Sequence, residues 1–471
     1  MLGGGVTGLA ACLRLSQGAR ERGLPLEVTL LEASPRVGGA IETARAGGCL
    51  LEKGPDCFLS IKPEGLALCR ELGLEGRLTG TRPECRRSFI LRGGRLHPVP
   101  QGFYLLAPSS LWPLAATSIF SPLGKLRMGL DLVLPRRRGT GDESLASFVR
   151  RRLGREALER MAQPMVAGIY AADPEELSLE ATMPQFIEME RRHRSVILAL
   201  RRRMAEARGT AGASGPRYAL FVALDEGMGL LVEALRERLA REGVSLRCGA
   251  RVSGLRREGG RWRVGLEEGG EMEADAVCSA LPAHAGSRLL AGLSPRLGAL
   301  LGQIPYGSVV TLNLVFRREQ LAHPLDGMGF VVPASEGLSL MACSFSSSKF
   351  PGRAPEGKVL LRAFAGGARG GTALGLPDAE LLRRLIGELR PVLGLSGEPE
   401  GVLLQRYARA MPHYTVGHLE RVGEMERLAG ELPGLALAGS AYRGVGIPDC
   451  AASAQAAAGR LLGFLASAPP A

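Results

Sequence analysis

The chain has 471 residues, which is too long for one hydrophobic core and predicts two or three domains. Its 45% of hydrophobic residues excludes a disordered chain. The sequence contains no uninterrupted apolar run of about 20 residues, which is the length that a membrane-spanning helix needs. The net charge of +12 permits nucleic acid, an anionic membrane surface or a polyanionic substrate as a partner, although GC-rich coding explains the abundance of arginine equally well.

The first element is a glycine-rich turn, Gly-Gly-Gly-Val-Thr-Gly-Leu at residues 3–9, which opens a helix at Val6. Gly3, Gly5 and Gly8 fit the pattern G-x-G-x-x-G. In this pattern the first glycine allows a tight turn, the second lets the backbone approach a pyrophosphate, and the third lets the helix pack closely. The amino end of the helix attracts the pyrophosphate. The turn therefore predicts a dinucleotide site.

A carboxylate follows at the spacing that such a site needs. An apolar strand at 26–32 ends at Glu32, whose side chain can accept hydrogen bonds from both ribose hydroxyls. Arg36 and the doublet Gly38-Gly39 come soon after it, which argues against a chance match. Only two residues precede the glycines, so the strand that should feed the turn is almost absent. We expect a start codon placed too late or a truncated chain, and a restored upstream extension should improve cofactor retention.

The segment 86–208 differs in character from what precedes it. Stretches of apolar and aromatic residues, broken by prolines, are followed by helical patterns at 144–153, 156–165 and 186–207. Arginine clusters are interleaved among them, at 136–138, 150–152, 191–194 and 201–203. Such a module suits a helix that lies in an anionic bilayer interface, and it equally suits a helical domain with a solvated basic face.

The remainder returns to α/β patterns. A helix is predicted at 225–241, and short strands at 244–248, 252–257, 261–266 and 276–279. Alternating β patterns dominate 305–366 and predict a sheet-based second domain. The end repeats the opening theme, with a strand at 435–438, a glycine-rich turn at 439–446 and an alanine-rich helix at 449–465. The nucleotide-binding domain is therefore predicted to be assembled from both ends of the chain.

Cysteine and histidine usage bounds the chemistry further. The nine cysteines contain no C-x-x-C pair, and the six histidines form no cluster with them. We expect reduced cysteines in a cytoplasmic protein and no metal site. No helix-turn-helix or aromatic-basic RNA signature accompanies the arginine clusters, so nucleic acid is not expected as a partner.

Longer sequence blocks accompany the glycine fingerprint. They lie at 51–56 (LEKGPD), 163–178 (QPMVAGIYAADPEELS), 350–355 (FPGRAP), 410–418 (AMPHYTVGH) and 438–450 (AGSAYRGVGIPDC). Together with the fingerprint they resemble the oxygen-dependent protoporphyrinogen oxidases of haem biosynthesis, within the amine-oxidase-like flavoproteins. The middle and late blocks distinguish this family from amine oxidases and carotenoid desaturases, which share mainly the two ends of the chain.

The resemblance implies an α/β fold with three domains and FAD as the cofactor. A Rossmann-like FAD-binding domain would comprise 1–85, 209–280 and 416–471, a helical membrane-facing domain 86–208, and a mixed-sheet substrate domain 281–415. The FAD contacts carried over are Gly3, Gly4, Gly5, Val6, Thr7, Gly8, Glu32, Arg36, Gly39, Gly54, Pro55, Asp56, Cys57, Val252, Ser440, Val445, Gly446 and Ile447. Val252 would meet the adenine through its backbone, and the last helix would direct its positive amino end toward the flavin, which favours the reduced anionic form.

The implied reaction is the oxidation of protoporphyrinogen IX to protoporphyrin IX by removal of six hydrogens, with oxygen reoxidising FAD and forming hydrogen peroxide. FAD carries this chemistry, so no catalytic acid or base is expected. The substrate site should be a wide apolar cleft with cations at its rim. Gly168 matches the family's glycine whose carbonyl faces the ring centre, and Val332 and Met341 are candidates for clamping the disc, with a role in the core equally open for both.

Two departures and several alternatives accompany the resemblance. Ser440 stands where many relatives have Asn, and Asp56 stands where some have an arginine that holds a propionate, so another cation must bind the substrate. The alternative substrate is coproporphyrinogen III, and another FAD oxidase or desaturase, or an inactive flavin-containing scaffold, is also open. We expect a cytoplasmic protein or one peripheral on the cytoplasmic face of the inner membrane, and the sequence is compatible with a homodimer.

Overall fold

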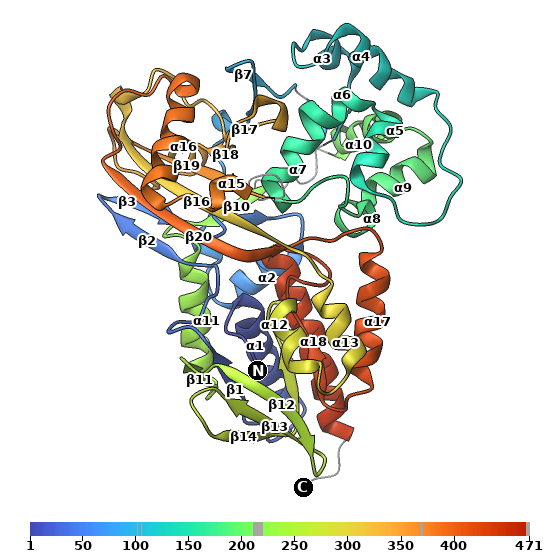
Figure 1. Ribbon diagram of the computed structural model, residues 1–471, viewed down its shortest axis with the longest axis vertical. Helices are drawn as coiled ribbons and strands as arrows, with labels where there is room; N and C mark the ends of the chain where they lie inside the picture. Colours follow the sequence, from blue (N-terminus) through green and yellow to red (C-terminus); the bar gives the residue numbers. More distant parts are fainter. Residues whose placement is uncertain (101, 105, 211–219, 368–370, 468–471) are drawn as a thin grey trace.

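The computed structural model describes residues 1–471 apart from 101, 105, 211–219, 368–370 and 468–471. Figure 1 shows three lobes. The lower lobe contains both the first and the last helix of the chain, the upper left lobe contains a large sheet, and the upper right lobe is mainly helical. The nucleotide-binding lobe is therefore assembled from both ends of the chain, as the sequence predicts.

The lower lobe is built on a parallel sheet whose central strand is very short. β1 (Thr29–Glu32) pairs in parallel with β11 (Ser245–Cys248), and β15 (Val277–Ser279) pairs in parallel with β21 (Leu435–Leu437). Leu2 forms parallel bridges to both Leu31 and Ser279, and so joins the two pairs. The residues before the glycine turn thus occupy the position of the strand that the fingerprint requires, although they fill only part of its length.

Close helix packing covers this sheet. α1 (Val6–Glu21) lies against α18 (Ile447–Ser467), and a Cβ added to Gly18 of α1 would overlap the Leu462 side chain of α18. α11 (Gly229–Arg241) packs on α1, and α2 (Pro63–Glu71) packs on α18. The buried face of α18 is rich in alanine, which lets the two long helices approach closely.

The lower lobe also includes segments on either side of the predicted domain boundary at 281. β12 (Val252–Glu258), β13 (Arg261–Leu266) and β14 (Glu271–Ala274) form an antiparallel sheet. α12 (Ala283–Leu290), α13 (Pro295–Gly302) and α17 (His418–Gly430) contribute to one hydrophobic core with Leu2 and Leu31. The apolar faces of α12 and α13 are therefore buried in the lower lobe, so residues 283–302 pack with that lobe.

A seven-stranded mixed sheet forms the upper left lobe, in the order β20-β16-β19-β18-β17-β6-β7. Its strands are β6 (Ser88–Arg92), β7 (Arg95–Pro98), β16 (Tyr306–Arg317), β17 (Gly329–Val331), β18 (Leu340–Ser344), β19 (Lys358–Gly366) and β20 (Gly401–Pro412), with α16 (Asp378–Leu393) packed on one face. β6 pairs in parallel with β17, and Phe89 and Leu91 enter the core of the sheet. Residues 88–98 are therefore part of the large sheet.

The helical lobe contains α3 (Leu111–Ala116), α4 (Pro122–Gly129), α5 (Leu145–Arg152), α6 (Arg155–Ala157), α7 (Gln163–Tyr170), α8 (Leu179–Thr182), α9 (Pro184–His193) and α10 (Val196–Thr210). A π turn at 158–162 joins α6 to α7. The pattern at 186–207 is interrupted at Arg194, which has φ +63°. Shorter elements are β2 (Thr43–Ala46), β3 (Cys49–Glu52), β4 (Phe58–Leu59), β5 (Leu78–Gly80), β8 (Phe103–Tyr104), β9 (Ala107–Pro108), β10 (Phe221–Leu224), α14 (Ser346–Lys349) and α15 (Gly371–Leu374).

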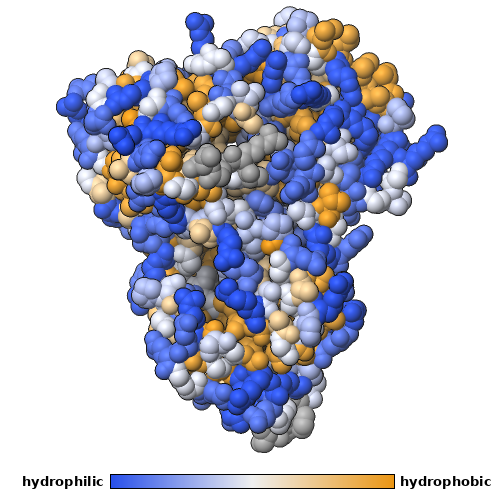
Figure 2. All heavy atoms as spheres, in the orientation of Figure 1, coloured by the Kyte–Doolittle hydropathy of each residue, from blue (hydrophilic) through white to orange (hydrophobic). Residues whose placement is uncertain are grey.

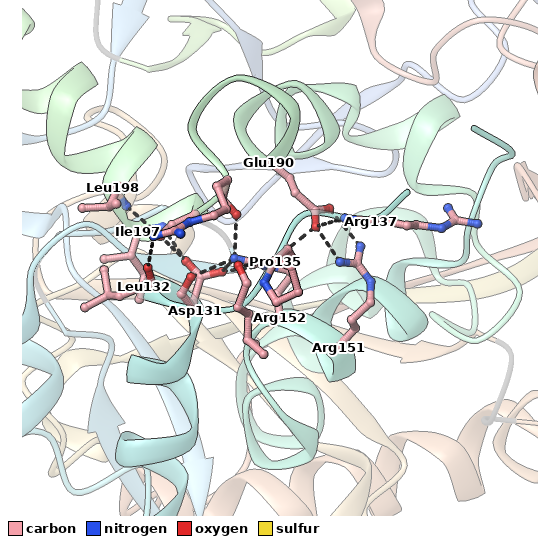
Figure 3. A network of polar contacts seen from close by, with 12 residues as sticks. Asp131, Leu132, Pro135, Arg137, Arg151, Arg152, Glu190, Ile197 and Leu198 are labelled. Carbon is pink, nitrogen blue, oxygen red and sulfur yellow. Dashed lines mark hydrogen bonds and ion pairs between the residues drawn. The ribbon is translucent and has the colours of Figure 1, made fainter. Parts of the chain in front are cut away.

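A buried polar network explains the interruption at Arg194 (Figure 3). Asp131 Oδ2 accepts hydrogen bonds from Ser195 Oγ at 2.5 Å and from Ile197 N at 3.0 Å, and so caps α10. Asp131 Oδ1 accepts from Nε of Arg152 at 2.6 Å, and both side chains of this ion pair are fully buried. Arg152 also donates to the carbonyl of Arg194 at 2.7 Å. The network thus ties the segment after α4 to α5 and α10.

Candidate functional site

The glycines of the first turn serve two different purposes. Gly3 has φ +98°, and a Cβ there would approach Ala280 O to 2.8 Å, while a Cβ on Gly8 would overlap Gly3 O. The fold itself therefore requires glycine at both positions. Gly5 has an ordinary φ of −69°, and a Cβ there would meet nothing within 4 Å. Open space lies at Gly5 next to the amino end of the 16-residue helix α1, which is the arrangement that binds a pyrophosphate.

Glu32 lies at the edge of this open space. Its Oε2 accepts a hydrogen bond from Gly4 N at 2.6 Å, and its Oε1 accepts from Ser34 N at 2.7 Å. The amide of Ala250 donates to Glu32 O at 2.9 Å, which brings the start of β12, with Val252, to the same end of β1. The carboxylate and the predicted adenine neighbour thus lie together at the carboxyl end of the strand, where nucleosides bind in such sheets.

The segment 36–40 continues the lining of the cradle. Gly38 N donates to Gly4 O at 2.7 Å, and a Cβ on Gly39, which has φ +58°, would approach Gly5 Cα to 3.2 Å. Arg36 donates to three backbone carbonyls of residues 37–41 and forms an ion pair with Glu42 at 2.6 Å. These contacts hold the guanidinium against residues 37–42 and so stabilise the conformation of this loop.

The next predicted segment, Gly54–Cys57, lies directly against that loop. A Cβ on Gly54 would overlap Ala40 O, and Arg362 Nη2 donates to both Lys53 O and Gly54 O. Burial raises the pKa of Asp56, but the Lys349 ammonium at 2.9 Å and the Arg362 guanidinium outweigh burial and hold this pKa below its ordinary value.

Sequence reasoning left Asp56 without a partner, and the structure provides one in Lys349. This lysine immediately precedes the block at 350–355, and the only signal that could have revealed it is the need of a buried carboxylate for a cation.

Two aromatic side chains support the glycine-rich turn before α18. Tyr414 Oη donates to Ser440 O at 2.5 Å and accepts from Gly444 N at 2.8 Å, and its ring stacks on His418 with centroids 4.1 Å apart. His418 Nε2 lies 2.7 Å from Tyr442 O, and burial lowers the pKa of His418 to about 4. At neutral pH the imidazole is therefore uncharged and donates to that carbonyl.

The amino end of α18 contacts Lys62, just before α2, and the start of α1. Asp449 Oδ2 accepts from Gly446 N at 3.1 Å, and Asp449 Oδ1 pairs with Lys62 Nζ at 2.5 Å. Thr7 of α1 hydrogen-bonds with Cys450 of α18. Val445, Gly446 and Ile447 thus lie at the helix start beside the fingerprint helix. The predicted cofactor residues at 3–8, 32–39, 54–57, 252 and 440–447 therefore come from five parts of the sequence.

The predicted substrate residues fall on two sides of β17. A Cβ on Gly168 of α7 would lie 3.7 Å from Val331 Cγ1, so Val331 faces α7. Its neighbour Val332 is buried in the core of the large sheet, as the alternative interpretation of this residue allowed. Met341 Cε lies 3.0 Å from the Cβ position of Gly367, beside the carbonyl that ends α7. The sequence did not indicate that Val331 faces α7, because the direction in which each side chain of a short strand points depends on how the strand pairs.

Comparisons with known proteins agree with this geometry. The model of the family described as flavin containing amine oxidoreductase matches residues 6–462. The chain belongs to the flavin-containing amine oxidoreductases. A coproporphyrinogen III oxidase of Bacillus subtilis (strain 168) is 36% identical over 99% of this chain and 98% of that protein, and a protoporphyrinogen oxidase of Bos taurus is 33% identical over 98% of each. A solved structure from Exiguobacterium sp. 255-15 is 31% identical, covers 98% of this chain and 97% of that chain, and has a TM-score of 0.86.

Membership of the flavin-containing amine oxidoreductases confirms the flavoprotein resemblance and FAD as the cofactor. The residues fit this group, because the unfilled space at Gly5 and the carboxylate of Glu32 provide for a pyrophosphate and a ribose. When bound, FAD supplies the electron-accepting chemistry, and the protein supplies binding, orientation and charge.

Proposed function

We propose that the chain oxidises a porphyrinogen to the corresponding porphyrin in haem biosynthesis, with oxygen as the final electron acceptor. Full-length likeness to proteins named protoporphyrinogen oxidase and coproporphyrinogen III oxidase supports this proposal. The observation that carries it is that the open cradle at Gly5 and the α7 face at Gly168 belong to one chain that matches these proteins from end to end. The protein is an oxidoreductase in which removal of hydrogen depends on how the macrocycle is held beside the cofactor.

Each cofactor residue has a part in this proposal. Gly3 to Gly8 hold the pyrophosphate at the amino end of α1, Glu32 binds the ribose, and Val252 meets the adenine through its backbone. Gly54–Cys57 and the start of α18, with Ser440 nearby, hold the flavin. Gly39 and Arg36 keep the loop at 36–42 in the shape that closes the cradle.

The macrocycle is held by shape in this proposal. The backbone of Gly168 faces its centre, and Val331 and Met341 provide apolar contacts from the neighbouring strands. Val332 supports this surface from the core. Burial lowers the pKa values of His413 and His418, so both imidazoles are neutral at physiological pH. Because the reaction requires no acid or base, we assign them a structural role.

Protoporphyrinogen IX is the first candidate substrate, and coproporphyrinogen III is the second. The second is favoured by the name of the bacterial relative at 36% identity. The two molecules differ in carboxylate number, so they should differ chiefly in KM, which reports binding to cations at the rim. Turnover of both compounds by the FAD-loaded protein, measured side by side as porphyrin fluorescence with peroxide release, tests the proposal, and formation of neither porphyrin would refute it.

We also propose that the helical lobe contacts an anionic membrane surface. Trp112, Leu123, Leu126 and Val133 are each more than 60% exposed, and Figure 2 shows apolar residues gathered at the upper right, where Figure 1 places α3 and α4. Leu123 and Leu126 are three residues apart on α4 and so share a face. No helix among the described residues is long and apolar enough to cross a membrane.

Sedimentation with vesicles tests this second proposal. Binding should require anionic lipid, fall as salt screens the arginines, and weaken in a Leu123→Ser/Leu126→Ser protein. A protein with Leu338→Ser, a 37% exposed leucine of the sheet lobe, is the matched control. Equal binding by all three proteins, or binding to neutral vesicles at high salt, would argue against this surface.

A further inference from the structure

The segment Gly54–Cys57 lies beside a cluster of buried charges that the nucleotide fingerprint leaves unexplained. Two carboxylates, Glu52 and Asp56, accompany three cations, Lys349, Arg353 and Arg362. Glu52, Arg353 and Arg362 are at most 4% exposed, and the Lys349 and Asp56 side chains are 12% and 20% exposed. Burying a charge costs free energy unless the charge is paired, so the ion pairs of this cluster show which charges are compensated within the protein.

Lys349 is fixed against the segment from several sides. Its Nζ donates to Asp56 Oδ2 at 2.9 Å and to Cys57 Sγ at 3.3 Å. The centres of the Phe350 and Phe221 rings lie 5.0 Å and 5.5 Å from the same nitrogen. The ammonium therefore has little freedom to move toward a substrate carboxylate. Its charge acts mainly on groups that lie next to Gly54–Cys57.

Arg362 gives this cluster its surplus of positive charge. Arg353 pairs with Glu52 at 3.5 Å, and Lys349 pairs with Asp56, whereas Arg362 forms no ion pair within the described part of the chain. Arg362 donates to two backbone carbonyls of the segment, and its Nε is buried without a partner. A group bound at Gly54–Cys57 is therefore close to the oppositely charged Asp56 and Lys349 and to the positive charge of Arg362, which no carboxylate neutralises within the described residues.

We propose that Asp56 and Lys349 hold the reduction potential of the flavin through two opposed effects, each of which shifts the potential when the other group is removed. The inference rests on the proposed position of the flavin at Gly54–Cys57. Transfer of a hydride from the substrate adds negative charge to the flavin, so a nearby ammonium favours the reduced form and a nearby carboxylate opposes it. In the wild-type protein the two effects largely cancel. Lys349 is thus a tuning residue, and oxygen later takes up the same two electrons.

Opposite substitutions in the pair separate this role from a purely structural one. Lys349→Met removes the cation that is paired with the Asp56 carboxylate and should lower the midpoint potential, whereas Asp56→Asn leaves the ammonium without its carboxylate and should raise it. Each variant should change the two-electron equilibrium constant at least tenfold, which equals about 30 mV. The Asp56→Asn/Lys349→Met protein should return close to wild type. Lys358→Met, which removes a half-buried lysine paired with Glu400 at 3.2 Å, is the control.

The measurement is equilibrium reduction of the FAD-loaded proteins against a reference dye, after FAD content has been checked. If Lys349→Met fails to fold, Asp56→Asn still tests the sign. Equal potentials in all FAD-loaded proteins, or shifts of both single variants in the same direction, would overturn the inference. A wild-type protein that binds FAD but oxidises neither porphyrinogen would refute the proposed function and leave the potentials to be judged separately.

Discussion

Replacing Gly5 with valine separates the needs of the fold from the needs of the cofactor. A Cβ at Gly5 meets nothing within 4 Å, and its backbone, with φ −69° and ψ 175°, suits any residue. The apoprotein should therefore fold, with about 1 kcal/mol or less lost through the poorer N-cap. The valine would fill the space in which we propose that the pyrophosphate binds. Loss of two charge-assisted hydrogen bonds, at about 1.5–3 kcal/mol each, should weaken FAD binding roughly 100-fold or more.

The assay is titration of apoprotein with FAD, followed by flavin fluorescence, with thermal unfolding of each apoprotein measured in parallel. Gly76→Val is the matched control, since a Cβ at Gly76 also meets nothing within 4 Å. Gly8→Ala provides the contrast, because its Cβ would overlap Gly3 O and should damage the fold itself. Wild-type affinity for FAD in a well-folded Gly5→Val protein would refute the placement of the pyrophosphate.

Three further substitutions test other parts of the molecule. Arg152→Met should lower the free energy of unfolding by about 3–5 kcal/mol in denaturant titrations, because it strands the buried Asp131 carboxylate; an unchanged midpoint would contradict this. His418 has a pKa of about 4 in the folded protein and near 6.5 in the unfolded chain, so between these pH values only the unfolded state is protonated and becomes more stable as the pH falls. The free energy of unfolding should therefore drop by about 3 kcal/mol by pH 4, and His418→Gln should give a flatter pH profile. Gly168→Val should reduce kcat about 100-fold by displacing the macrocycle by ~1 Å while FAD content stays stoichiometric, and joint loss of FAD would point to a different role.

Features encoded by neighbouring residues could be predicted from the sequence. The helix after the glycine turn, the strands at 252–257 and 261–266, and the final helix all lie close to their expected positions. Each depends on local periodicity or turn residues, which a single segment contains in full.

Features that depend on distant partners could not be predicted. The break at Arg194 exists because Asp131, far away in the sequence, caps the next helix. Strands at 88–98 join the large sheet through pairing with β17, which also decides that Val331 and not Val332 faces α7. The partner of Asp56 is likewise nearly 300 residues away. In each case the tertiary contact, and no local pattern, determines the outcome.

Anaerobic mixing of the FAD-loaded protein with a porphyrinogen tests the proposed function most directly. The flavin absorbance should bleach as hydrogen passes from the macrocycle, and air should restore it with release of peroxide and appearance of porphyrin fluorescence. Because shape and not an acid–base pair holds the reacting bond, the rate should vary little across neutral pH. A protein with stoichiometric FAD that bleaches with neither protoporphyrinogen nor coproporphyrinogen would contradict the proposal.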